Sequence, residues 1–189
     1  MFRTLTRGIL AGFIVLAVHS PNSAADCTID QSTCTDHGFS ANVGPSPDII
    51  GQSFTACQTG VVTSVTFNAN LVTPGLTLGL EVGTNICAPS YTQSVSAVQG
   101  SNTVVLDTPF PVTDGAVYSF GLQPSGGHSP LMLWGCGEDV YAGGIYCLCG
   151  AGHVFVPYPQ FDLAFTVQIT TEPTPTRANT WGSVKDLYR

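Results

Sequence analysis

Between Arg7 and Arg177 the chain contains no lysine and no arginine. Residues 26 to 171 nevertheless hold ten of the twelve acidic residues, and the formal charge of the whole chain is −7. Proteins hold nucleic acids and anionic membranes largely through lysine and arginine. The composition therefore predicts an acidic protein that binds neither nucleic acid nor nucleotides.

Helical periodicity is also missing. No stretch before the C-terminal end sustains the 3.6-residue apolar period of a helix, and 21 glycines and 13 prolines disfavour long helices. Short apolar runs bounded by turn residues are present instead. We expect strands at Ile49–Ala56, Gly60–Asn68, Leu76–Gly83, Gln93–Val98, Thr103–Leu106, Ala116–Leu122, Leu131–Trp134 and Phe161–Thr170.

Several of these runs alternate with a period of two, as half-buried antiparallel strands do. In the run from Val61 to Phe67, positions 61, 65 and 67 are expected on one face together with Thr63. Eight such strands are too many for one open sheet to cover its core, which favours two packed sheets. The predicted fold is an all-β, antiparallel, jelly-roll-like two-sheet β-sandwich stapled by disulfides, with a closed barrel as the alternative.

The N-terminal end has the pattern of a secretory signal peptide. Arg3 and Arg7 precede an apolar run from Ile9 to Val18 that is too short to span a membrane, and small residues ending at Ala25 mark a cleavage site. We therefore expect residues 1–25 to be removed, no transmembrane segment to remain, and the mature protein to be secreted or at the cell surface. Three basic residues would then face twelve acidic ones, a formal charge of −9.

The exported part holds an odd number of cysteines, namely Cys27, Cys34, Cys57, Cys87, Cys136, Cys147 and Cys149. Disulfides are the default outside the cell, and short Cys27/Cys34 and Cys57/Cys87 loops are plausible pairings, although spacing alone does not fix connectivity. The alternative is a zinc site built from Cys136, Cys147, Cys149 and His153, but these lack the paired Cys-x-x-Cys spacing of such sites.

Catalytic signatures are scarce. No Gly-x-Ser-x-Gly elbow surrounds a serine, and only three histidines follow the signal segment. Carboxylates of the kind that glycosidases use are Glu81, Glu138, Asp139 and Asp162. Calcium is the cofactor that these hard oxygens would suit. Its candidate ligands are Glu138 and Asp139, or else Asp26, Asp30 and Asp36, and the alternative is that these acids only solvate the surface.

Aromatic residues gather in the glycine- and cysteine-rich part of the chain. Sugar-binding sites stack exposed rings against the ligand, and loops at the rim of a sandwich often carry binding groups. The candidate ligand-binding residues are Trp134, Tyr141, Tyr146 and Tyr158. We expect Tyr141 and Tyr146 to be exposed, whereas the continuously apolar run around Trp134 favours a core position for that ring.

The chain changes character at its C-terminal end. We divide it into a loop-rich segment over 26–48, a sandwich over 49–171, a Pro/Thr linker over 172–180 and a short tail over 181–189. Positive charge returns only here, and the tail residues that would form a docking or sorting tag are Trp181, Lys185, Tyr188 and Arg189.

The run Gly51-Gln52-Ser53-Phe54 and the closing run Phe161–Phe165 resemble those of β-sandwich modules in secreted bacterial surface proteins. The ending Thr-Trp-Gly-x-x-Lys-x-Leu-Tyr-Arg is similar to short C-terminal tails of exported bacterial proteins. This resemblance implies the sandwich fold, export and an accessory binding role, with no catalytic residues.

Taken with the residues, it predicts a secreted, non-catalytic binding or adhesion module whose partner is a polysaccharide or a surface protein. A carbohydrate-active hydrolase and a purely structural surface component are the alternatives.

Overall fold

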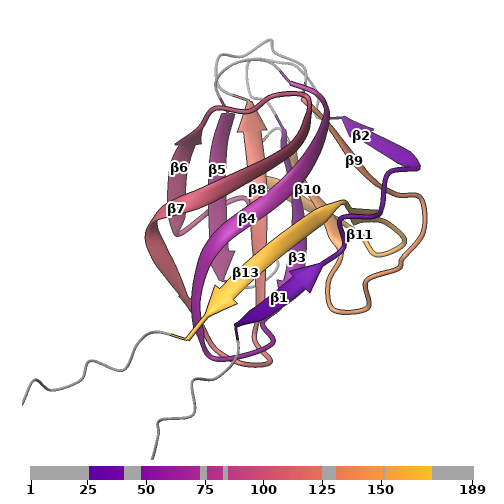
Figure 1. Ribbon diagram of the computed structural model, residues 1–189. Coiled ribbons are helices and arrows are strands. Elements are labelled where there is room, and N and C mark those ends of the chain that lie inside the picture. The colour runs from indigo at the N-terminus through magenta and orange to yellow at the C-terminus, as the bar shows by residue number, and fades with distance from the viewer. Residues whose placement is uncertain are drawn as a thin grey trace, which may run out of the picture.

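The computed structural model describes residues 26–40, 48–72, 76–82, 85–124, 131–150 and 152–171. Within these ranges the chain forms strands joined by turns and no helix, so none that could cross a membrane (Figure 1). The strands are β1 (Cys27–Asp30), β2 (His37–Ser40), β3 (Ile49–Thr55), β4 (Gly60–Leu71), β5 (Leu76–Val82), β6 (Tyr91–Val95), β7 (Gly100–Val112), β8 (Val117–Pro124), β9 (Met132–Cys136), β10 (Tyr146–Gly150), β11 (Val154–Tyr158), β12 (Asp162–Leu163) and β13 (Phe165–Thr170).

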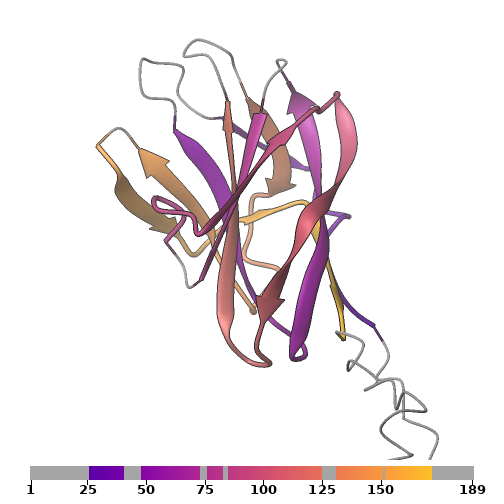
Figure 2. The same ribbon diagram turned by 90° about the vertical axis from the view of Figure 1, so that its left-hand side faces the viewer.

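The strands form two antiparallel sheets that pack face to face (Figure 2). The first sheet has the order β1-β13-β4-β9-β12, with β7 paired to β4 and β2 paired to β9. The second has the order β11-β10-β3-β8-β5-β6. The predicted disulfide-stapled, two-sheet, all-β fold is confirmed.

The core lies between the sheets and is built from alternate residues of the long strands. Its largest fully buried rings are Phe54, Phe67, Phe120 and Phe165, one each from β3, β4, β8 and β13. Each of these rings occupies the inward position of a period-two strand, as the sequence pattern requires.

One strand departs from simple alternation. Ser64 and Val62 of β4 lie opposite the consecutive residues Gln168 and Ile169 of β13, so β4 contains one extra residue at this point, which is a β-bulge. A bulge inserts one extra residue and so changes which face the following residues occupy. Val62 therefore joins Val65 and Phe67 in the central core, and the prediction that Val61 shares their face is wrong.

The segment predicted to be loop-rich, 26–48, contains two strands. β1 pairs with β13, and β2 pairs with β9, so both become part of the first sheet. β10 and β11 were also not anticipated from the sequence. All four strands have four or five residues and are supplied with partners by distant parts of the chain, which a local pattern does not reveal.

The disulfides join Cys27 to Cys57, Cys34 to Cys136 and Cys87 to Cys149, and the remaining cysteine, Cys147, is free and buried. The expected Cys27/Cys34 and Cys57/Cys87 pairings are therefore wrong. The reason is the placement of the N-terminal strands, because β1 lies along β13 while the next turn carries Cys34 to the end of β9.

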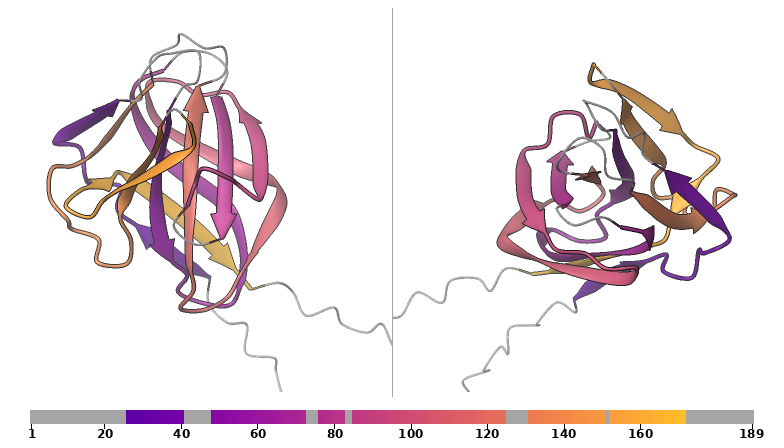
Figure 3. Two further views of the ribbon diagram at one scale, coloured as in Figure 1. Left: turned by 180° about the vertical axis from the view of Figure 1, so that it is seen from behind. Right: turned by 90° about the horizontal axis from the view of Figure 1, so that it is seen from above.

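Both ends of the described chain lie at the same end of the sandwich. Cys27 is opposite Ile169 in the β1–β13 pair, and Figures 1 and 3 show that β2 lies away from this end. The predicted signal segment and the tail, with Trp181, Lys185, Tyr188 and Arg189, lie outside the described residues.

Candidate functional site

Five aromatic rings meet where β2 of the first sheet faces β10 and β11 of the second. We call this group, His37, Phe39, Tyr146, Tyr158 and Phe161, the aromatic edge. His37 stacks on Phe161 with ring centroids 5.7 Å apart and planes inclined by 10°. The other contacts run from Phe39 to Tyr146 at 4.4 Å, from Tyr146 to Tyr158 at 5.4 Å and from Phe39 to Phe161 at 5.5 Å.

The backbone brings these rings together from four separate segments. β2 pairs with β9 so that His37 lies opposite Gly135. A side chain at Gly135 would overlap both the Phe39 ring and the backbone of Asp162, so only glycine lets the ring approach. Phe161 is fixed by the turn after β11, where its amide donates to Tyr158 O at 3.2 Å.

Exposure increases across the aromatic edge from the core outward. Phe39 and Tyr146 are only 6% and 4% exposed, whereas Tyr158 and Phe161 are half-buried and His37 is exposed. Burial raises the pKa of Tyr146 further above its ordinary value, so its hydroxyl stays protonated well into the alkaline range. The buried rings of Phe39 and Tyr146 therefore support the outer three rings, which present aromatic surface to solvent.

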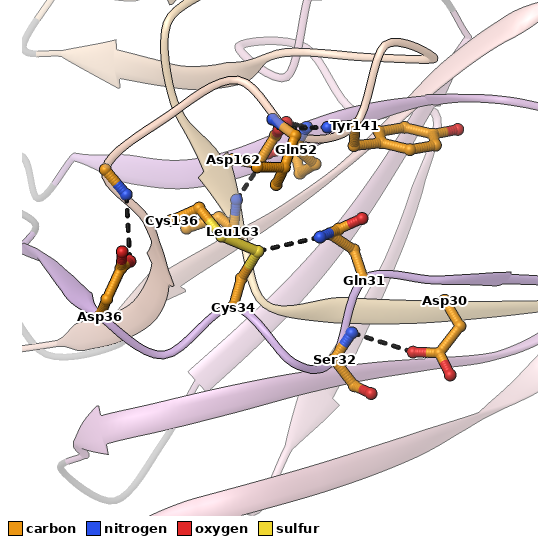
Figure 4. The surroundings of a disulfide bond; sticks show 12 residues. Asp30, Gln31, Ser32, Cys34, Asp36, Gln52, Cys136, Tyr141, Asp162 and Leu163 are labelled. Atoms are coloured by element: carbon orange, nitrogen blue, oxygen red, sulfur yellow. Dashed lines mark hydrogen bonds between the residues drawn. A yellow bond between two sulfur atoms is a disulfide. The ribbon is translucent and has the colours of Figure 1, made fainter.

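Asp162, which follows Phe161 of the aromatic edge in the chain, forms a buried polar pair with Gln52 (Figure 4). Gln52 and Asp162 are both fully buried, and Gln52 Nε2 donates to Asp162 Oδ1 at 2.7 Å. The amides of Val140 and Tyr141 donate to Asp162 Oδ2 at 2.8 and 2.7 Å. Gln52 Oε1 in turn accepts from Leu163 N at 2.9 Å. The pair thus ties the loop between β9 and β10 to the two sheets.

Asp162 is unsuited to catalysis in this setting. Burial raises the pKa of its carboxyl group, although three hydrogen-bond donors oppose the shift. Because both carboxylate oxygens already accept hydrogen bonds and the side chain has no exposed surface, a substrate has no access to it. The arrangement positions a loop and supplies no general acid.

The predicted ligand-binding residues fall in different places. Tyr158 belongs to the outer part of the aromatic edge, but the expectation that Tyr146 is exposed is wrong, because β10 turns its ring into the core. Tyr141 is not exposed as expected: it is half-buried, packs edge-on against Phe165 and accepts a hydrogen bond from Thr55 N at 3.2 Å. Trp134 is half-buried in β9 between the buried residues Leu133 and Gly135, on the outer side of the strand, so the expectation of a core position for its ring is wrong.

The candidate metal ligands are also separate. Glu138 and Asp139 are exposed, and the described residues contain no cluster of three or more groups suited to a metal. Asp36 accepts from Gly137 N, and Asp30 accepts from Ser32, whose hydroxyl and then amide hydrogen bonds lower the pKa of the Asp30 carboxyl group. The zinc alternative is wrong in its ligand set, because Cys136 and Cys149 are held in disulfides.

Sequence analysis missed three members of the aromatic edge, His37, Phe39 and Phe161. The first two lie in the segment that was expected to be a loop. The alternation in His37-Gly38-Phe39-Ser40 was the available signal, with Phe39 buried between exposed neighbours in β2.

No protein-family model and no curated protein matches the chain. Fold and site together define the class as a disulfide-linked two-sheet β-sandwich protein with a partly exposed aromatic edge.

Proposed function

We propose that the protein is a secreted, non-catalytic binding module whose aromatic edge holds a neutral polysaccharide. The observation that carries this proposal is the graded cluster, in which buried Phe39 and Tyr146 support the accessible rings of His37, Tyr158 and Phe161. Rings that are fixed before binding lose little conformational entropy when a sugar stacks on them.

Charge supports a neutral ligand. The described ranges contain no lysine or arginine, and the exposed acids Asp36, Glu138 and Asp139 lie on the segments next to His37. An anionic polysaccharide would be repelled by this surface, whereas the hydroxyl groups of a neutral one can donate to the carboxylates.

Export and attachment complete the proposal. Three disulfides suit an oxidising compartment. The chain leaves β13 at the end of the sandwich away from β2, so a C-terminal attachment through Trp181, Lys185, Tyr188 and Arg189 would leave the aromatic edge facing outward (Figure 1).

The test compares Phe161→Ala with Phe155→Ala. Both rings are half-buried, but Phe155 lies on β11 outside the aromatic edge, in a separate apolar cluster. A printed array of neutral glycans selects the probe, and titration calorimetry measures its affinity. We expect Phe161→Ala to weaken binding about tenfold, which corresponds to about 1.4 kcal/mol, and Phe155→Ala to bind normally. Equal affinities for the wild type and Phe161→Ala, or no glycan bound by the wild type, would contradict the proposal.

A further inference from the structure

Three glycines form a row across the outer face of the second sheet. Gly51 of β3 is opposite Gly121 of β8, and Gly121 is opposite Gly79 of β5. Side chains at these positions would project from the face that points away from the core. Their absence leaves a shallow groove of bare backbone across three neighbouring strands.

Residues 85–90, which we call the strap, lie in this groove. A Cβ atom at Gly51 would come within 2.7 Å of Ile86 Cδ1, and one at Gly79 within 2.9 Å of Pro89 Cβ. Ile86 is only 2% exposed. The glycines are therefore needed for the strap to reach the sheet, and Ile86 and Pro89 occupy the space that side chains would fill.

A disulfide holds one side of the strap. Cys87 is bonded to Cys149 of β10, with their Cα atoms 5.3 Å apart. Cys147 lies two residues before Cys149 and therefore on the same face, opposite Gly51 in the strand register. Both cysteines of β10 pack with Ile86 and Cys87 in one small apolar cluster that is separate from the main core.

The other side of the strap is less closely packed. A cavity of about 30 Å³ lies between it and the sheet, lined in part by Ile86, Pro89, Gly79 and Gly121. This space is large enough for a water molecule. The strap therefore meets the sheet through Ile86 and Pro89 with a water-sized space between them, and the Cys87–Cys149 bond is its covalent attachment to the sheet.

We propose that the Cys87–Cys149 disulfide is a redox latch that keeps the strap over the glycine groove and shields the thiol of Cys147. An external dithiol reductant would open it by two successive exchanges. The first thiolate of the reductant bonds to one latch sulfur and releases the other as a thiolate. The second thiolate then bonds to the first reductant sulfur and releases the remaining latch sulfur, so the reductant leaves as a disulfide and Cys87 and Cys149 become thiols. The strap then leaves the groove and Cys147 becomes accessible. This device is independent of the aromatic edge.

The closed state is consistent with a protected thiol. Cys147 has no exposed surface, and burial raises its pKa to about 12. A thiol that is both covered and protonated reacts slowly with alkylating reagents, because the thiolate is the nucleophile. Its alkylation rate therefore reports whether the strap is in place.

Two double variants form a matched pair, Cys87→Ser/Cys149→Ser and Cys27→Ser/Cys57→Ser. Each removes one disulfide, and each leaves Cys147 as the only free thiol in the oxidised protein. Intact-mass measurement of maleimide addition gives the rate, and hydrogen exchange compares the amides of 85–90 with those of β3. We expect the latch variant to react at least tenfold faster than the wild type and the control, with loss of protection in the strap and retained protection in β3. Equal rates, or a protected strap in a folded latch variant, would overturn the proposal.

If the latch variant does not fold, the wild-type protein can be used to test whether opening the latch exposes Cys147. Limited treatment with dithiothreitol is followed by a maleimide pulse and peptide mapping. We expect molecules that are labelled on Cys87 and Cys149 to carry a label on Cys147 as well. A folded species with the first two labels but not the third would show that the latch does not control access.

Discussion

The buried pair of Gln52 and Asp162 makes a prediction that depends on the direction of each hydrogen bond. In Asp162→Asn the amide oxygen still accepts from the Val140 and Tyr141 amides, but the new amide nitrogen faces Gln52 Nε2, which is also a donor. Rotating the Gln52 amide by 180° does not remove the donor–donor contact, because the Gln52 nitrogen would then face the Leu163 amide, which is also a donor. One buried donor is left without an acceptor in either arrangement.

The expected loss of folding stability in Asp162→Asn follows from this single donor without an acceptor. A buried polar group without a partner costs about 1–3 kcal/mol. Asp162→Ala leaves three donors without their acceptor, so we expect a loss of at least about 3 kcal/mol. The order Asp162→Ala, Asp162→Asn, wild type is therefore the expected order of increasing stability.

Exchanging the two functional groups should restore the network. In Gln52→Glu/Asp162→Asn, one carboxylate oxygen at position 52 accepts from the new amide and the other accepts from Leu163 N. We expect the double variant to lie within about 1 kcal/mol of the wild type, with a favourable coupling energy of at least about 1 kcal/mol between the two changes.

Gln52→Glu alone supplies a second readout. It places two buried carboxyl groups against each other, so they share a proton and the folded-state pKa rises. The folded state then binds more protons than the unfolded state, so this variant loses stability as pH rises from about 4 to 7. The assay is urea denaturation followed by circular dichroism at both pH values. Additive effects of the two changes, or an Asp162→Asn loss below about 0.5 kcal/mol, would refute the proposed geometry.

Three further predictions follow from burial and from the position of the chain ends. Tyr146→Ala should cost about 3–5 kcal/mol, because its ring is 4% exposed and supports the aromatic edge; a change of less than 1 kcal/mol in urea would place the ring at the surface. Burial raises the pKa of the Cys147 thiol from its usual 9.0 to about 12 in the folded state. The contribution of this thiol to folding stability is therefore intact below pH 9 and is lost, by up to about 4 kcal/mol, as pH rises towards 12. Cys147→Ala should therefore show a smaller alkaline loss in urea titrations than the wild type, and parallel curves would contradict this. Truncation after Thr171, beyond the last residue of β13, should leave the melting temperature unchanged while releasing the protein from its attachment; a lowered melting temperature would show that the tail packs on the sandwich.

The sequence by itself determined the fold class and the central strands. The alternation around Phe54, Phe67 and Phe120 is local, because each strand must turn apolar side chains to one face whatever its partner is. The absence of lysine and arginine over residues 26 to 171 likewise follows from composition alone, and an odd cysteine count required at least one cysteine without an intramolecular partner.

Only the tertiary structure decided which residues meet. Gln52 and Asp162 are 110 positions apart, Cys34 and Cys136 are 102 apart, and the ring of His37 in β2 stacks on that of Phe161 in the turn between β11 and β12. The two-residue alternation of a strand predicts to which face each side chain points. It carries no information on strand order or on bulges. The disulfide pairing, the aromatic edge and the strap over the glycine row therefore depend on how distant strands pair, which is a property of the assembled sheets.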